Sequence, residues 1–123
     1  MPLDSKPTPI EEQISNAETL VITRTLDGNA TIKMIIDGVE EERFVPSFAD
    51  AIDGLVICGV EKGAVASVAM QRVSPEIMFD TKPRIDFFRI SFHGADGARL
   101  GGRDTLKYRD DVAVKLAPKL TAG

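Results

Sequence analysis

The chain has 123 residues, of which 43% are hydrophobic and 28% are charged, and its formal net charge is −4. This length suits one domain, and the composition excludes a disordered chain, a collagen-like repeat and a disulfide scaffold. The longest nearly apolar stretch, residues 54–60, is far too short to span a membrane, so we expect no membrane contact.

The compartment is predicted from the N-terminal sequence and from the cysteine content. No basic stretch followed by an apolar core opens the chain, so no secretory signal is expected. Cys58 is the single cysteine, and among aliphatic neighbours it is typical of a buried, inert thiol. We therefore expect a cytoplasmic protein, or a subunit of a particle assembled in the cytoplasm.

The first half of the chain predicts a flexible arm followed by a β meander. Residues 1–13 carry three prolines and few apolar side chains, which indicates a mobile arm before a single β domain over 14–123. Alternating apolar residues predict strands from residue 19, over 30–36 and over 39–45. The dipeptides Asp27-Gly28 and Asp37-Gly38 between them suit tight hairpin turns.

The third of these strands carries Glu40, Glu41 and Glu42 in succession. Three consecutive carboxylates place at least one charge on each face of a strand, which indicates an edge strand. A metal site is the alternative, but the Asp-rich spacing of a calcium loop is absent, and we expect no metal or cofactor.

Helical spacing is visible once, after Pro46. Ser47 is a good N-cap, and Phe48, Ala51 and Ile52 share one face, which predicts a short helix over 47–53. Residues 55–60 are expected to form a strand. Residues 64–73 fit a helix or a strand, and the preceding turn favours a strand.

The strongest strand pattern covers residues 84–93, with a slip at Phe87-Phe88 that suggests a bulge. Further strands are predicted over 104–109 and 112–116, with a glycine-rich loop over 99–103. About seven or eight short strands with one short helix predict a mainly β fold, an antiparallel sandwich or a closed barrel.

Candidate catalytic groups are few. His93 is the single histidine, and Ser91, Asp86 and Asp96 lie near it, as a small hydrolase or isomerase would need. The Gly-x-Ser-x-Gly elbow of a serine hydrolase is absent, and a strand-end histidine is the simpler interpretation. The loop after Gly97 lacks the Gly-Lys-Ser/Thr ending of a phosphate loop.

Charge divides the chain into two unlike halves. Residues 1–61 hold 12 acids and four bases, a net −8, whereas residues 62–123 hold 11 bases and seven acids, a net +4. The basic cluster consists of Arg99, Arg103, Lys107 and Arg109. Few aromatic residues accompany it, so nucleic-acid binding is not expected. The halves can pair within one fold or between copies stacked head to tail.

These observations favour a non-enzymatic β domain that works by association with itself or with other protein subunits. It would be a structural or accessory subunit of a larger assembly, for example a phage or virus-like particle or its tail. The interface would join Glu40, Glu41 and Glu42 to the basic cluster of a neighbour. A small-ligand-binding β-barrel is the alternative, with the His93 enzyme behind it.

Overall fold

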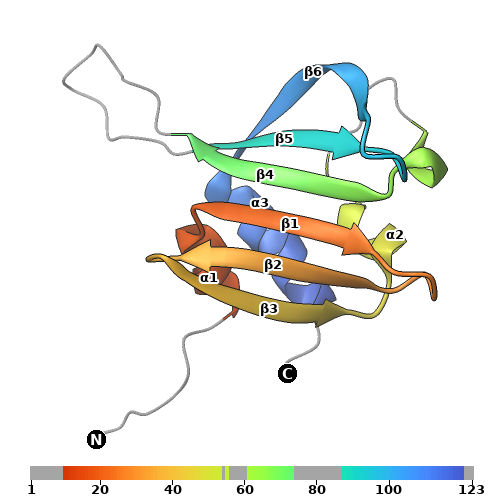
Figure 1. The fold of residues 1–123 in the computed structure, drawn as a ribbon. Helices are drawn as coiled ribbons and strands as arrows, with labels where there is room; N and C mark the ends of the chain where they lie inside the picture. Colours follow the sequence, from red (N-terminus) through yellow and green to blue (C-terminus); the bar gives the residue numbers. More distant parts are fainter. Residues whose placement is uncertain (1–9, 54, 56–60, 74–86, 121–123) are drawn as a thin grey trace, which may run out of the picture.

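The described residues form one antiparallel sheet of six strands, in the order β3-β2-β1-β4-β5-β6 (Figure 1). It is seen in a computed structural model that describes residues 10–53, 55, 61–73 and 87–120. The strands are β1 (Thr19–Arg24), β2 (Ala30–Ile36), β3 (Val39–Val45), β4 (Ser67–Val73), β5 (Phe87–His93) and β6 (Arg99–Tyr108).

Three short α-helices and two single 3₁₀ turns complete the described residues. The helices are α1 (Ile10–Asn16), α2 (Phe48–Ile52) and α3 (Arg109–Leu116), and the 3₁₀ turns are η1 (Lys62–Ala64) and η2 (Ala117–Lys119). Figure 1 shows α1 and α3 together behind the sheet, and Ser15 Oγ on α1 donates to Asp110 Oδ1 on α3 at 3.3 Å. The first and last helices of the chain therefore cover the same face.

The sheet consists of two meanders, β1–β3 and β4–β6, which join where β1 pairs with β4. Each meander corresponds to one charge half of the sequence. The first meander is as predicted: β2 and β3 have the expected bounds, and Asp37, Gly28 and Gly38 take the positive φ that tight turns between strands require.

One face of this sheet is buried and apolar. Alternate residues of the inner strands face the helices and are at most 3% exposed: Leu20, Ile22, Ile32, Met34, Val68, Met70, Phe88, Ile90 and Phe92. The helices contribute Ile14, Ile52, Val112 and Leu116 to the same cluster. We call this the covered face, and the opposite side the open face.

The expectation of a mainly β fold is confirmed, but the sandwich and the barrel are not what the described residues form. The six strands make a single open layer whose outer members are β3 and β6. The second layer is helical, because α1, α2 and α3 supply the apolar surface that a second sheet would supply in a sandwich.

Two predictions about the C-terminal third are wrong. Residues 112–116 form part of α3 rather than a strand, because Val112, Ala113 and Leu116 are buried on one helical face while Val114 is 58% exposed. Residues 99–103 belong to β6 rather than to a loop. An edge strand tolerates Gly101 and Gly102 because only one side of it must pair.

Among the predictions for residues 1–73, the arm is wrong in part, and the short helix is confirmed. Residues 10–13 begin α1 and are not part of a mobile arm, because Ile10 and Ile14 pack against the core. The short helix is confirmed as α2, with Ser47 Oγ accepting from the Asp50 amide at its start. Residues 67–73 are strand β4, and the strand expected over 55–60 lies outside the described residues except for Leu55.

The strand expected over 84–93 is β5, with its described part starting at Phe87. The irregularity in its pairing with β6 lies between Ile90 and Phe92, not at Phe87-Phe88. Phe88 is fully buried on the covered face, whereas Phe87 lies on the open face and stacks on Tyr108, with ring centroids 4.7 Å apart. Two adjacent phenylalanines are therefore accommodated by the two faces of one strand.

Candidate functional site

The candidate site is the pair of sheet edges, β3 and β6, because the predicted interface residues lie on them. The prediction that Glu40, Glu41 and Glu42 mark an edge strand is confirmed, since β3 is the first strand of the sheet order. Glu40 and Glu42 are opposite Ile35 and Lys33 and lie on the open face. Glu41 is opposite Met34 and lies on the covered face.

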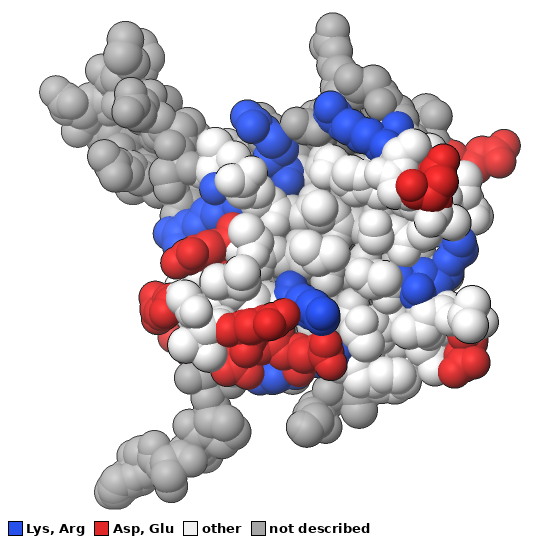
Figure 2. All heavy atoms as spheres, in the orientation of Figure 1, with Lys and Arg blue, Asp and Glu red and all other residues white. Residues whose placement is uncertain are grey.

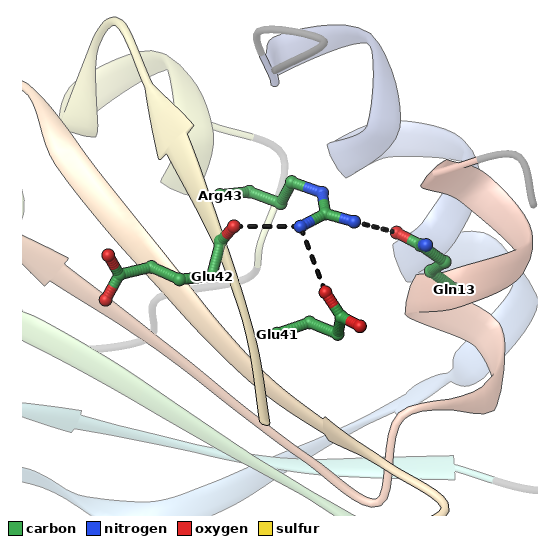
Figure 3. Close-up of polar contacts among 4 residues, drawn as sticks. All are labelled: Gln13, Glu41, Glu42 and Arg43. Atoms are coloured by element: carbon green, nitrogen blue, oxygen red, sulfur yellow. Dashed lines mark hydrogen bonds and ion pairs between the residues drawn. The ribbon is translucent and has the colours of Figure 1, made fainter. Parts of the chain in front are cut away.

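Arg43 organises the covered side of this edge (Figure 3). Its guanidinium donates to the Glu42 backbone carbonyl at 2.9 Å, to Glu41 Oε2 at 3.4 Å and to Gln13 Oε1 on α1 at 2.9 Å. Arg43 thus connects β3 to α1 through Gln13, and its pair with Glu41 lies within β3. Of the three glutamates, Glu41 has a structural partner, and Glu40 and Glu42 are exposed.

The backbone of β3 presents an unpaired side as well. Thr25 donates to the Asn29 carbonyl across the β1–β2 hairpin, and amide directions alternate along each strand. Odd-numbered residues of β2 therefore bond to β1, and even-numbered residues of β2 bond to β3. Met34 and Ile32 are opposite Glu41 and Arg43, so the amides of Glu41 and Arg43 point toward β2. The N–H and C=O groups of Glu40, Glu42 and Phe44 therefore point outward from the sheet.

The basic cluster lies along the opposite edge but does not gather into one patch. Arg99, opposite His93, is exposed on the open face at the start of β6, and Lys107, opposite Phe88, lies near its end on the other face. Arg109 begins α3 and pairs with Asp110 at 3.7 Å. Arg103 lies within β6, and its side chain is outside the described part.

The glutamates of β3 and the basic residues of β6 lie at opposite sides of the described sheet. Four strands separate β3 from β6, which places the edges ~24 Å apart at the usual spacing of ~4.8 Å between strands. Figure 2 shows an acidic group at the β3 edge with one basic side chain beside it, basic side chains at the upper end with two acidic ones to their right, and an uncharged area at the centre. Direct ion pairing between these edges inside one fold is excluded by that distance.

The structure brings Ser91 and His93 together, with Ser91 Oγ 3.2 Å from His93 Nε2 on the open face. Of the two candidate acids, Asp96 accepts the Ala98 amide in the β5–β6 turn, and Asp86 lies outside the described residues, as does Cys58. A nucleophile also needs donors for an oxyanion and a third group that orients the imidazole. Among the described residues, Ser91 and His93 are hydrogen-bonded to each other, and no acid orients the imidazole.

Hollows on the described surface are shallow. One of about 390 Å³ lies on the open face over Val21, Ala69 and Ser91, and one of about 220 Å³ lies beside Arg24 and Phe48. The barrel interior that a small-ligand carrier would use does not exist in an open sheet. Among the described residues, no group of three or more His, Cys, Asp or Glu side chains is placed to hold a metal ion.

No protein-family model, curated protein or solved structure matches this chain. No helix in the described ranges has the length and apolar character needed to cross a membrane. Inferences about the function of these two strands therefore rest on their geometry and charge.

One contributor to the edge, Gln13, escapes the sequence-based prediction because three nearby prolines suggested an arm. The missed signal is the spacing of Ile10, Ile14 and Ala17, which fall on one helical face after Pro9. Glu11 and Glu12 also provide the negative charge that suits a first helical turn.

Proposed function

We propose that this protein works by association, as a structural or accessory subunit that joins copies of itself edge to edge. The observation that carries the proposal is that the acidic strand β3 and the basic strand β6 are the two outer strands of the open sheet that the described residues form. An exposed edge is a template for a further strand, and opposite charge selects which strand is added.

Strand direction favours the pairing of unlike edges. All neighbouring strands in this sheet are antiparallel, so β3 and β6 run in opposite directions. A second copy in the same orientation then brings its β6 antiparallel to β3 of the first, with the helices of both copies on the same side. The outward amides of Glu40, Glu42 and Phe44 would bond to that strand.

Like edges are kept apart by the same charges. Pairing β3 with β3 would set six glutamates from two copies side by side, and like charges opposite one another are destabilising. Contacts between unlike edges are heterologous, so repetition gives a closed ring or an open filament. This is the arrangement of repeating particles, and we propose a phage or virus-like particle, a tail or a comparable structure assembled in the cytoplasm as its setting.

Sedimentation velocity at low and high salt tests the proposal. We expect large species that shrink as salt rises past ~0.15 M, where the screening length falls below ~8 Å. Glu40→Lys with Glu42→Lys should abolish association, and leaving Glu41 unchanged preserves its pair with Arg43. Reversal of Arg99, Arg103 and Lys107 to Glu in the same chain should restore it.

A backbone variant separates strand addition from charge alone. Glu42→Pro removes an outward N–H without breaking a ladder bond to β2, whereas Glu42→Gln removes only the charge. We expect loss of the large species in the first and weakening in the second. A wild type that stays small at low salt, or a doubly reversed β3 that assembles normally, contradicts edge-to-edge association.

A further inference from the structure

The open face of the sheet is an uncovered surface with a mixed character. Val21, Ile35, Phe44 and Tyr108 are exposed on it to 36%, 38%, 46% and 47%, and no described element covers them. Val21, for example, lies between the core residues Leu20 and Ile22 of the covered face. The open face therefore combines the flat shape of a sheet with large apolar side chains that a solitary sheet would replace with polar ones.

The strand register arranges this face in rows that cross the sheet. One row runs Phe44, Thr31, Thr23, Ser67, His93 and Arg99. The next runs Glu42, Lys33, Val21, Ala69 and Ser91, and the third runs Glu40, Ile35, Thr19, Gln71 and Arg89. Each row begins at an acidic or aromatic β3 residue, and two of the three rows end at an arginine, with threonine, serine, alanine, glutamine, lysine and apolar residues between.

We infer that the open face binds the open face of a second copy, related by a two-fold axis parallel to the strands, and that the pair forms a β-sandwich. A rotation about that axis exchanges the two edges, so β3 of one copy lies over β6 of the other. Glu40 and Glu42 then lie across from β6, the strand that begins at Arg99, whereas Arg89 on β5 lies across from β2. An axis perpendicular to the strands would instead set β3 over β3.

In this pair, the charged residues determine how the two copies are oriented, and the centre of the open face provides the packing contact. Arg99 has an interaction within its own chain, so it contributes the sign of the local potential rather than an unpaired group. The axis passes between β1 and β4, next to Val21 and Ala69, where the hollow of about 390 Å³ lies. Val21 of the second copy would fill part of that hollow.

The size of the face suits such a pair. Six strands about 4.8 Å apart and about seven residues long cover roughly 25 Å by 23 Å, or ~600 Å² on each copy. Two such faces bury ~1,200 Å², the lower limit for specific, stable interfaces. Packed sheets lie ~10 Å apart with strands inclined by ~30°, which the twist of each sheet allows.

Face-to-face pairing is independent of the edge contact and leaves both edges accessible. The chain supplies its own probe, because it has one tyrosine and no tryptophan, and Tyr108 lies on the open face. Acrylamide quenching of Tyr108 fluorescence, followed from dilute to concentrated protein, reports burial of this face. Sedimentation on the same samples reports mass.

Two valines provide a matched pair of variants. Val21→Arg introduces a charge at the centre of the open face, whereas Val114→Arg introduces the same charge on the outer side of α3. In wild type and Val114→Arg, we expect quenching to fall as protein concentration rises and a species of twice the monomer mass to form. Val21→Arg should lose both changes.

Glu42→Pro separates this inference from the edge proposal. Loss of larger species with retention of a dimer and of Tyr108 protection supports face-to-face pairing, whether or not the edges pair in wild type. Ile35→Lys replaces Val21→Arg if that variant does not fold. Concentration-independent quenching in wild type, or protection that survives Val21→Arg and Ile35→Lys in folded protein, overturns the inference.

Discussion

The two faces of the sheet differ in composition and in exposure to solvent. On the covered face, the central alternate residues of β1, β2, β4 and β5 are apolar and almost fully buried. On the open face, the intervening residues mix threonine, serine, charged groups and a few large apolar side chains. The same strands thus carry a buried apolar core on one side and a mixed, partly exposed surface on the other.

This difference predicts where the free energy of folding and the free energy of association come from. The covered face accounts for the hydrophobic cluster that joins the sheet to α1, α2 and α3. Burial on that face stabilises the monomer at ~25 cal/mol per Å² of apolar surface. The open face and the edges contribute little to the monomer and are available for contacts between copies.

The largest expected difference is between Phe88 and Phe87, which are adjacent in sequence and lie on opposite faces. Phe88→Ala should lower the free energy of unfolding by ~3–5 kcal/mol, because the side chain is fully buried. Phe87→Ala should cost only ~1 kcal/mol, mainly its stacking on Tyr108. Chemical denaturation measures both, and equal losses would contradict the assignment of the faces.

A second pair of variants tests the helical cover. Leu116→Ala should cost ~2–4 kcal/mol, because Leu116 is 1% exposed between α3 and the sheet. Val114, two residues earlier on the outer side of α3, is the control, and Val114→Ala should change stability by less than ~0.5 kcal/mol. If residues 112–116 were a strand, Val114 and Leu116 would share a face and the two variants would behave alike.

A third comparison concerns the margin of the covered face. Arg43→Ala removes the contacts to Gln13 and Glu41 and should cost ~1 kcal/mol, since both contacts are partly exposed. Gln13→Ala should cost less, because Arg43 keeps Glu41 and the Glu42 carbonyl. Thermal melts measure the effect, and an unchanged melt for Arg43→Ala would mean that α1 is held by apolar packing alone.

The sequence predicts the first meander well because its signals are local. Two Asp-Gly turns and strict alternation determine β2 and β3 to the residue, and Ser47 marks the start of α2. The acidic edge is predictable for the same reason, since three consecutive glutamates cannot lie between two neighbouring strands. The position of the basic edge follows only from the strand order, which is a tertiary property.

The failures come from segments whose local pattern fits two structures. Val112, Val114 and Leu116 alternate as in a strand, while Val112, Ala113 and Leu116 fit one face of a helix, and packing against α1 decides between them. The prediction of a second sheet is wrong for a different reason. Strand count cannot show whether the partner layer of a sheet is a sheet, a helix or a second molecule.

The smallest expected effect lies on the open face and controls the association experiments. Lys33 and Glu42 are directly opposite on β2 and β3, and a cross-strand pair of opposite charge is worth ~0.2–1 kcal/mol. Glu42→Lys should therefore destabilise the monomer by no more than about that amount. Lys33→Glu in the same chain should recover the loss, because it restores opposite charges across the strands, and denaturation curves of the single and double variants measure this. A loss of several kcal/mol would mean that Glu42 is a folding residue, and that its effect on association could not be assigned to the sheet edge.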